Sequence, residues 1–130
     1  MPLAPLVGIP LSAASVAIGI GALFVMAFAL TSLGFILAWR MESIQGFHGI
    51  VNLLLMPMWF LSGALFPVRG AAGGLSHVMR LDPVTYGLAA FREGLYAVPG
   101  VEAIRPDLAW GVTVGFAVVV FGLAVALARR

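Results

Sequence analysis

Three long stretches of the chain consist mainly of apolar and small residues and contain no charged side chain: residues 1–39, 43–68 and 108–128. All seven basic and five acidic side chains fall between these stretches or at the C-terminal end. Each stretch holds the roughly 20 apolar residues that a helix needs to cross about 30 Å of hydrocarbon. The pattern therefore predicts three membrane-spanning helices, at about residues 11–38, 46–66 and 108–128.

The first predicted span begins after a segment rich in proline, a residue that lacks an N–H and is a poor helix interior residue. It ends at Trp39 and Arg40, which are residue types typical of a membrane surface. An uncharged start and an overlong apolar run argue against a cleaved secretory signal. We expect this span to be retained.

The second predicted span has a proline in its middle. Pro57 cannot donate to the carbonyl of Leu53, so a kink or a locally opened turn is expected there. Helical spacing places four residues on one face, namely Asn52, Met56, Trp59 and Gly63. Because an amide facing lipid is costly, we expect this face to point at protein or water. For Trp59, interfacial anchoring or lipid packing is the alternative.

The segment from residue 67 to 107 predicts two short helices, at about 71–81 and 83–96. Asp82 and Pro83 form a start signal for the second one, because Asp caps free N–H groups and Pro is tolerated at the first helical position. Its apolar positions recur with helical spacing: Val84, Leu88, Phe91 and Leu95. Helices this short suit an interfacial or re-entrant position. The fold class is thus an all-α membrane protein, one transmembrane domain over residues 1–130, with three spans and a re-entrant pair of short helices.

The last predicted span carries Gly111 and Gly115, a spacing that lets two helix backbones approach closely. With three spans the chain ends lie on opposite sides of the membrane. Arg40, Arg129 and Arg130 crowd the span ends on one side, so we place that side, with the C-terminus, in the cytoplasm.

Composition excludes several classes of protein. A nucleic-acid partner is not expected, because the net charge of +2 comes from scattered arginines without a lysine. The chain has no cysteine for a thiolate site. It also lacks the lysine of a P-loop, so any ATP must bind to a partner and no cofactor is expected in the chain itself. His48 and His77 lie on opposite sides of the membrane in this topology, so no metal site is expected.

Two segments carry a family resemblance. The run NLLLMPMWFLSGALFP, residues 52–67, and the block LDPVTYGLAAFR, residues 81–92, resemble the signature of type-2 ABC transporter permeases. The likeness covers nearly the whole chain and is strongest to drug-resistance and nodulation-type exporters. Such permeases have six membrane helices, with a hairpin of short helices outside the membrane between the fifth and the sixth.

The resemblance implies that this chain is the C-terminal half of a six-span permease in the bacterial plasma (inner) membrane. It also implies an ABC ATPase subunit, a second permease copy or the missing N-terminal half, and membrane lipids as partners. The family's main ATPase contacts lie in that missing first half, so the resemblance implies that this chain needs a partner for transport.

The leading hypothesis is a membrane-spanning permease subunit of an ATP-driven exporter of drugs, lipids or polysaccharides, with no catalytic residue of its own. Asn52, Met56, Trp59 and Gly63 would face the pathway, Pro57 would supply the kink, and Asp82, Pro83, Tyr86 and Arg92 would belong to an outer gate. The alternative is a non-transporting membrane scaffold or assembly subunit. An intramembrane enzyme would need paired ionisable groups within the spans, which contain none.

Overall fold

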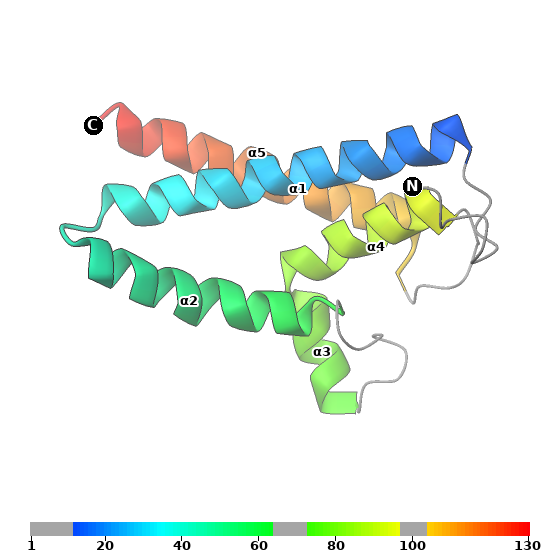
Figure 1. Ribbon diagram of the computed structural model, residues 1–130, viewed down its shortest axis with the longest axis horizontal. Coiled ribbons are helices and arrows are strands. Elements are labelled where there is room, and N and C mark those ends of the chain that lie inside the picture. Colours follow the sequence, from blue (N-terminus) through cyan, green and yellow to red (C-terminus); the bar gives the residue numbers. More distant parts are fainter. Residues whose placement is uncertain (1–11, 64–72, 97–103) are drawn as a thin grey trace.

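The computed structural model describes residues 12–63, 73–96 and 104–130, which form five helices (Figure 1). These are α1 (Ala13–Trp39), α2 (Ile44–Leu61), α3 (Gly73–Leu81), α4 (Pro83–Tyr96) and α5 (Pro106–Ala128). The described residues contain no strand. α1, α2 and α5 are long and apolar enough to cross a membrane. This confirms the predicted all-α membrane fold with three spans and two short helices between the second and the third.

Side chains at the helix starts explain where the first and last spans begin. The Ser12 hydroxyl accepts a hydrogen bond from the N–H of Ser15 at 3.0 Å, so it caps α1 at its first turn. α5 starts at Pro106, two residues before the prediction, and the adjacent Asp107 places a negative charge in its first turn. The C-terminal ends, Trp39 and Ala128, lie within one residue of those expected.

α2 differs from its predicted range at both ends. Ser43 accepts a hydrogen bond from a backbone N–H three residues further on (3.1 Å), so the helix begins at Ile44, before the predicted residue 46. The helix continues through Pro57 and ends at Leu61. Residues 64–66, where the span was expected to end, lie outside the described part of the chain.

The two short helices follow the sequence prediction closely. α3 begins at Gly73, and residues 71 and 72 of the predicted range lie outside the described part of the chain. Asp82 separates α3 from α4, and Pro83 is the first residue of α4. The Asp-Pro pair therefore ends one helix and starts the next, as expected from its capping chemistry.

α1 and α5 lie side by side, and α4 packs against both of them (Figure 1). α4 covers only the first half of α1. Its Gly87 lies against Met26 in the middle of α1, and its Gly94 lies against Ile18 near the start. A helix of 14 residues is about 21 Å long, which is about half the length of α1.

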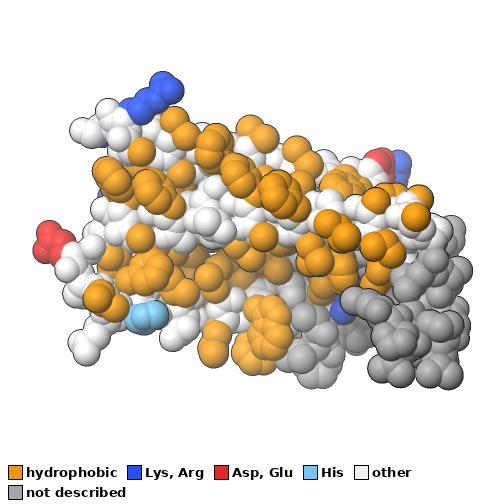
Figure 2. Space-filling model, turned by 45° about the horizontal axis from the view of Figure 1, so that its top comes forward, with side chains coloured by type: hydrophobic (Ala, Val, Ile, Leu, Met, Phe, Trp, Pro, Cys, Tyr) orange, Lys and Arg blue, Asp and Glu red, His pale blue; other side chains and the backbone are white. Residues whose placement is uncertain are grey.

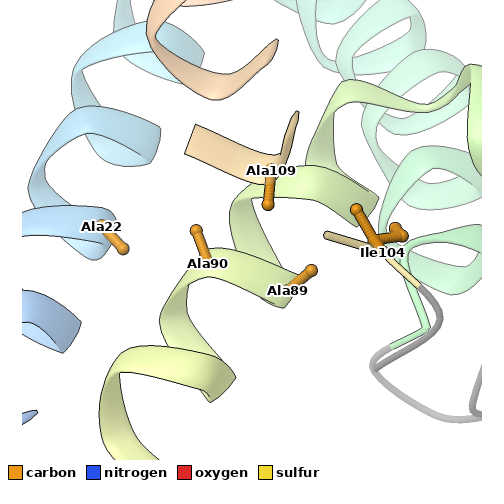
Figure 3. Close-up of a cluster of buried hydrophobic side chains, with 5 residues drawn as sticks. All are labelled: Ala22, Ala89, Ala90, Ile104 and Ala109. Carbon is orange, nitrogen blue, oxygen red and sulfur yellow. The ribbon is translucent and has the colours of Figure 1, made fainter. Parts of the chain in front are cut away.

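Small side chains form the contact among α1, α4 and α5. Ala22, Ala90 and Ala109, one from each helix, are fully buried and cluster with Ala89 and Ile104 (Figure 3). Side chains of this size let helix backbones approach closely, which is how helices associate in membranes where lipid competes for larger apolar groups. The core therefore sits where α4 enters between the two long spans.

The large apolar residues of α4 are not the ones that it buries. Val84, Leu88, Phe91 and Leu95 all remain partly exposed. The buried positions among the described side chains of α4 carry small residues instead: Thr85, Gly87, Ala89, Ala90 and Gly94. In a membrane a large apolar side chain need not be buried in protein, because lipid is an equally apolar neighbour. Phe91 does reach α1, with ring atoms 3.6 Å from the site a Cβ on Gly19 would occupy.

The molecular surface matches a lipid environment. Apolar side chains cover the middle of the face shown in Figure 2, and charged side chains lie mainly at its two ends. At Gly111 and Gly115 no described atom lies within 4 Å of the position that a Cβ would occupy. The close helix approach predicted there is not made by the described helices; it occurs at Gly87 and Gly94 of α4 instead.

Candidate functional site

The face of α2 that carries the predicted pathway residues is not covered by the rest of the described chain. The partly buried positions in the second half of α2 are Val51, Leu55, Met58 and Leu61. Asn52 is exposed, as are Met56 (56%) and Trp59 (52%). The described residues form no hydrogen bond with the Asn52 side chain. Any cover for this face therefore lies outside the described part of the chain.

Gly63 does not share that face, although helical spacing placed it there. α2 ends at Leu61 with Ser62 as its C-cap, and the Ser62 hydroxyl donates to the carbonyl oxygen of Trp59 at 2.6 Å. Gly63 follows with φ 85°, a left-handed backbone conformation that glycine adopts readily. The chain therefore leaves the helix axis before Gly63, and the helical face is limited to Asn52, Met56 and Trp59.

Asp82 lies at the junction of α3 and α4 and is buried, with 6% of its surface exposed. Its Oδ1 accepts a hydrogen bond from the N–H of Val84 at 2.9 Å, which satisfies one free donor at the start of α4. Its Oδ2 is also buried but has no hydrogen-bond partner among the described residues. The predicted capping role is thus seen, together with an unpaired oxygen.

This environment changes the acidity of the carboxyl. Burial raises the pKa of Asp82 from its ordinary value of 3.8 to about 6, because an ionised carboxylate loses its hydration there. The hydrogen bond from Val84 lowers the pKa by a smaller amount, since it stabilises the charged form. The neutral acid is therefore favoured at mildly acidic pH.

Tyr86 ties the two short helices together. Its hydroxyl donates to the carbonyl oxygen of Arg80 at 2.7 Å, across the junction formed by Asp82 and Pro83. The N–H of Asp82 also donates to the carbonyl oxygen of Met79 at 3.3 Å. These two hydrogen bonds, from Tyr86 and from Asp82, thus hold the angle between α3 and α4.

Arg92 lies further along α4 and contacts the end of α2 instead. Its Nη2 donates to the carbonyl oxygen of Gly63 at 2.9 Å, and the Thr85 hydroxyl donates to the carbonyl oxygen of Leu61 at 3.3 Å. Thr85 is buried and Arg92 is partly buried, so both donors are largely shielded from solvent.

The structure therefore divides the predicted gate into two parts. Asp82, Pro83 and Tyr86 form the α3–α4 junction, whereas Arg92 joins α4 to the end of α2. The sequence analysis did not identify Thr85, because threonine is compatible with many helix positions and does not by itself indicate a contact. The one indication in the sequence is that its hydroxyl lies on the small-residue side of α4, two turns before Arg92.

A groove of about 590 Å³ opens between the junction and α5. Its walls are mainly apolar, with Tyr86 and Arg80 on one side and Gly115, Phe116 and Val119 on the other. No group of three or more potential metal-ligating side chains occurs in the described residues.

Comparison with known proteins assigns this arrangement to a family. The sequence profile of the ABC-2 type transporter family matches residues 1–96, which include α1 to α4. The chain belongs to the ABC-2 type transporter family. Proteins of this family are membrane permeases of transporters.

A relative of this ABC-2 type chain is Nodulation protein J of Rhizobium meliloti (strain 1021), with 36% identity over 102 residues. The match covers 78% of this chain but 38% of the relative's own length. The chain thus spans less than half of the curated relative that it matches. No solved structure matches the chain. The ABC-2 assignment confirms the resemblance found at residues 52–67 and 81–92.

Proposed function

We propose that this chain forms the C-terminal part of the membrane domain of an ATP-driven exporter in a bacterial inner membrane. The observation that carries the proposal is the position of α4, which packs between α1 and α5 over half their length and is hydrogen-bonded to the end of α2. In this proposal α4, held to the end of α2, takes two positions relative to α1 and α5 while all the helices stay folded. Such alternative packing is what a transport cycle requires.

Energy would come from a partner ATPase that binds ATP, since this chain has no P-loop lysine. The end of α1, which Arg40 caps, and the C-terminus lie at the same end of the bundle (Figure 1), and we propose that this end faces the cytoplasm. The α3–α4 junction would then act as an outer gate. Either a second permease copy or an N-terminal half would complete the domain.

The exposed face of α2 fits a wall of the pathway. It combines the amide of Asn52 with the apolar side chains of Met56 and Trp59, and none of the three is covered by the described chain. A mixed surface of this kind suits an amphipathic or lipid-linked molecule, which includes many drugs, lipids and polysaccharide precursors. Catalysis is not part of this role.

The test is ATP-dependent export from vesicles that contain this chain, its completing permease segment and the ATPase that co-purifies with it. We expect Trp59→Ala and Asn52→Leu to lower the export rate several-fold or more, while the complex still assembles. Leu53→Ala is the matched control, because Leu53 is 77% exposed and its side chain projects about a quarter-turn away from that of Asn52.

Export that is unchanged in both variants would contradict the pathway assignment. A complex that assembles normally but moves no substrate in any variant would instead identify the chain as a membrane scaffold. Failure to recover any ATPase with the chain would contradict the proposed function as a whole.

A further inference from the structure

The end of α2 presents a problem that α4 resolves. The last carbonyl groups of a helix have no donor within that helix. In water such groups are hydrated, but within or near hydrocarbon an unsatisfied carbonyl costs several kcal/mol. At α2 the carbonyls of Leu61 and Gly63 accept hydrogen bonds from side chains that lie 24 and 29 positions further along the sequence.

The two donors are arranged to serve this end of the helix. Thr85 and Arg92 are two turns apart on α4, so they project from the same face of it. Thr85 is 1% exposed, and its hydroxyl reaches Leu61, where the helix stops. Arg92 reaches Gly63, where the left-handed backbone has turned the chain off the helix axis. We call this pair of contacts the α2 clasp.

Charge strengthens the contact. A helix C-terminus carries a partial negative charge, and a guanidinium beside it is favourable. Hydrogen bonds from a charged donor are also stronger than those between neutral groups. The only described basic side chain on α4 is that of Arg92, so the charged donor lies where α2 ends. Arg80 on α3 is exposed and lines the groove beside α5 instead.

We propose that Arg92 is a positioning residue, which with Thr85 couples the α3–α4 pair to α2 so that these elements move as one body during transport. This rests on the proposed transport function. The clasp is the link through which a displacement of the proline-containing span reaches the α3–α4 junction. Neither residue needs to touch the transported molecule.

The first experiment measures the coupling itself and does not require transport. The cysteine-free chain allows spin labels at Leu53 on α2 and Leu81 at the end of α3, which are both well exposed (77% and 84%). In lipid bilayers we expect one narrow distance distribution. Arg92→Gln should raise the population of detached states about tenfold or more, as expected for loss of a charged hydrogen bond. Arg92→Lys should restore part of the narrow distribution.

Two further variants separate the clasp from general effects. Arg80→Gln removes the same charge from the neighbouring helix and should leave the distribution unchanged. Thr85→Val removes one donor at nearly constant volume and should broaden the distribution less than Arg92→Gln does; it also serves if Arg92→Gln does not fold. A distribution that stays narrow in Thr85→Val and in every folded Arg92 variant would overturn the proposal.

The second experiment tests whether the α2 clasp contributes to the transport cycle. In export-competent vesicles Arg92→Gln should lower the maximal export rate about tenfold, leave the half-saturating substrate concentration unchanged and be partly rescued by Arg92→Lys. A change confined to the half-saturating concentration would mean that Arg92 acts on substrate, and would refute a positioning role. If no variant, including the native chain, exports anything, the proposed function fails, and the spin-label result still decides whether the clasp exists.

Discussion

Asp82 combines two roles that oppose each other energetically. Its Oδ1 caps α4, a role in which an ionised carboxylate is the better acceptor. Its Oδ2 is buried without a described partner, an environment that disfavours the same ionised form. Burial outweighs the cap, since the pKa rises to about 6. Neighbouring groups do not offset this rise in the pKa of Asp82. α1 and the end of α2 bring no charged side chain, and Arg92 is directed to Gly63.

Asp82 therefore gives the fold a defined pH dependence. Well below pH 3.8 the carboxyl is neutral in folded and unfolded chains alike, and the folded state has its full stability. Between pH 3.8 and about 6 the unfolded chain ionises while the folded chain stays protonated, so stability falls by up to about 3 kcal/mol and then levels off. Asp82→Asn keeps a capping oxygen and removes the charge, so its thermal unfolding in lipid or detergent should lose most of this dependence.

The comparison is the unfolding temperature of both proteins between pH 4 and 8. Glu42→Gln, which changes an exposed carboxylate in the α1–α2 turn, should retain the full dependence. If Asp82→Asn unfolds with the same pH profile as the native chain, the carboxyl is not the source.

At the scale of elements, the contact between α1 and α4 depends on glycine at particular positions. A Cβ on Gly94 would lie 2.6 Å from the Cγ2 of Ile18 and 3.0 Å from the backbone nitrogen of Gly19. The backbone of α1 cannot move aside as a flexible side chain can. Gly87 differs, because a Cβ there would meet the end of the Met26 side chain, which has other rotamers.

Gly94→Ala should therefore separate α4 from α1 and destabilise the fold by about 1–3 kcal/mol, the usual cost of overpacking. Gly111→Ala is the control, because no described atom lies within 4 Å of its Cβ position. That variant should leave stability unchanged or raise it by up to about 1 kcal/mol through better helix propensity. Protease protection of α4 in lipid distinguishes the two, and equal protection in both variants would contradict the close approach at Gly94.

The elements themselves were predictable because their causes are local. Charge-free length predicts a span, and the Asp82–Pro83 pair fixes the boundary between the short helices to the residue. Contacts between elements were not predictable in the same way. Periodicity favours large apolar residues, so it pointed to Val84 and Leu88 on α4 and passed over the small residues that pack. The α2 clasp joins positions far apart in sequence, and helical spacing carries no information about such pairs.

At the scale of the whole molecule, the long helices carry charged residues at both of their ends. Glu42 is in the turn between α1 and α2, which lies at the same end of the bundle as the C-terminal arginines, and Arg105 with Asp107 lies at the start of α5, at the opposite end (Figure 1). Arg105 donates to Asp107 at 2.7 Å in a well-exposed pair, which contributes little to stability but marks a wet surface. The apolar zone between the groups is the part that lipid must cover.

The proposed orientation makes the two ends distinguishable in cells. The chain has no cysteine, so Glu42→Cys and Arg105→Cys each provide a unique thiol at an exposed position. A membrane-impermeant maleimide should label Arg105→Cys in intact cells from which the outer barrier has been removed. It should label Glu42→Cys only after the inner membrane is opened. The reverse pattern would invert the topology and place the α3–α4 pair inside the cell.

The alanine cluster shared by α1, α4 and α5 has one more consequence. An alanine side chain has no rotamers, so pressing Ala22, Ala90 and Ala109 together restricts almost no side-chain freedom. Bringing long side chains into register would instead cost conformational entropy at every closure. Helices that meet through alanine methyl groups can thus separate and pack together again many times with little entropic penalty. This property is useful for helices that rearrange repeatedly.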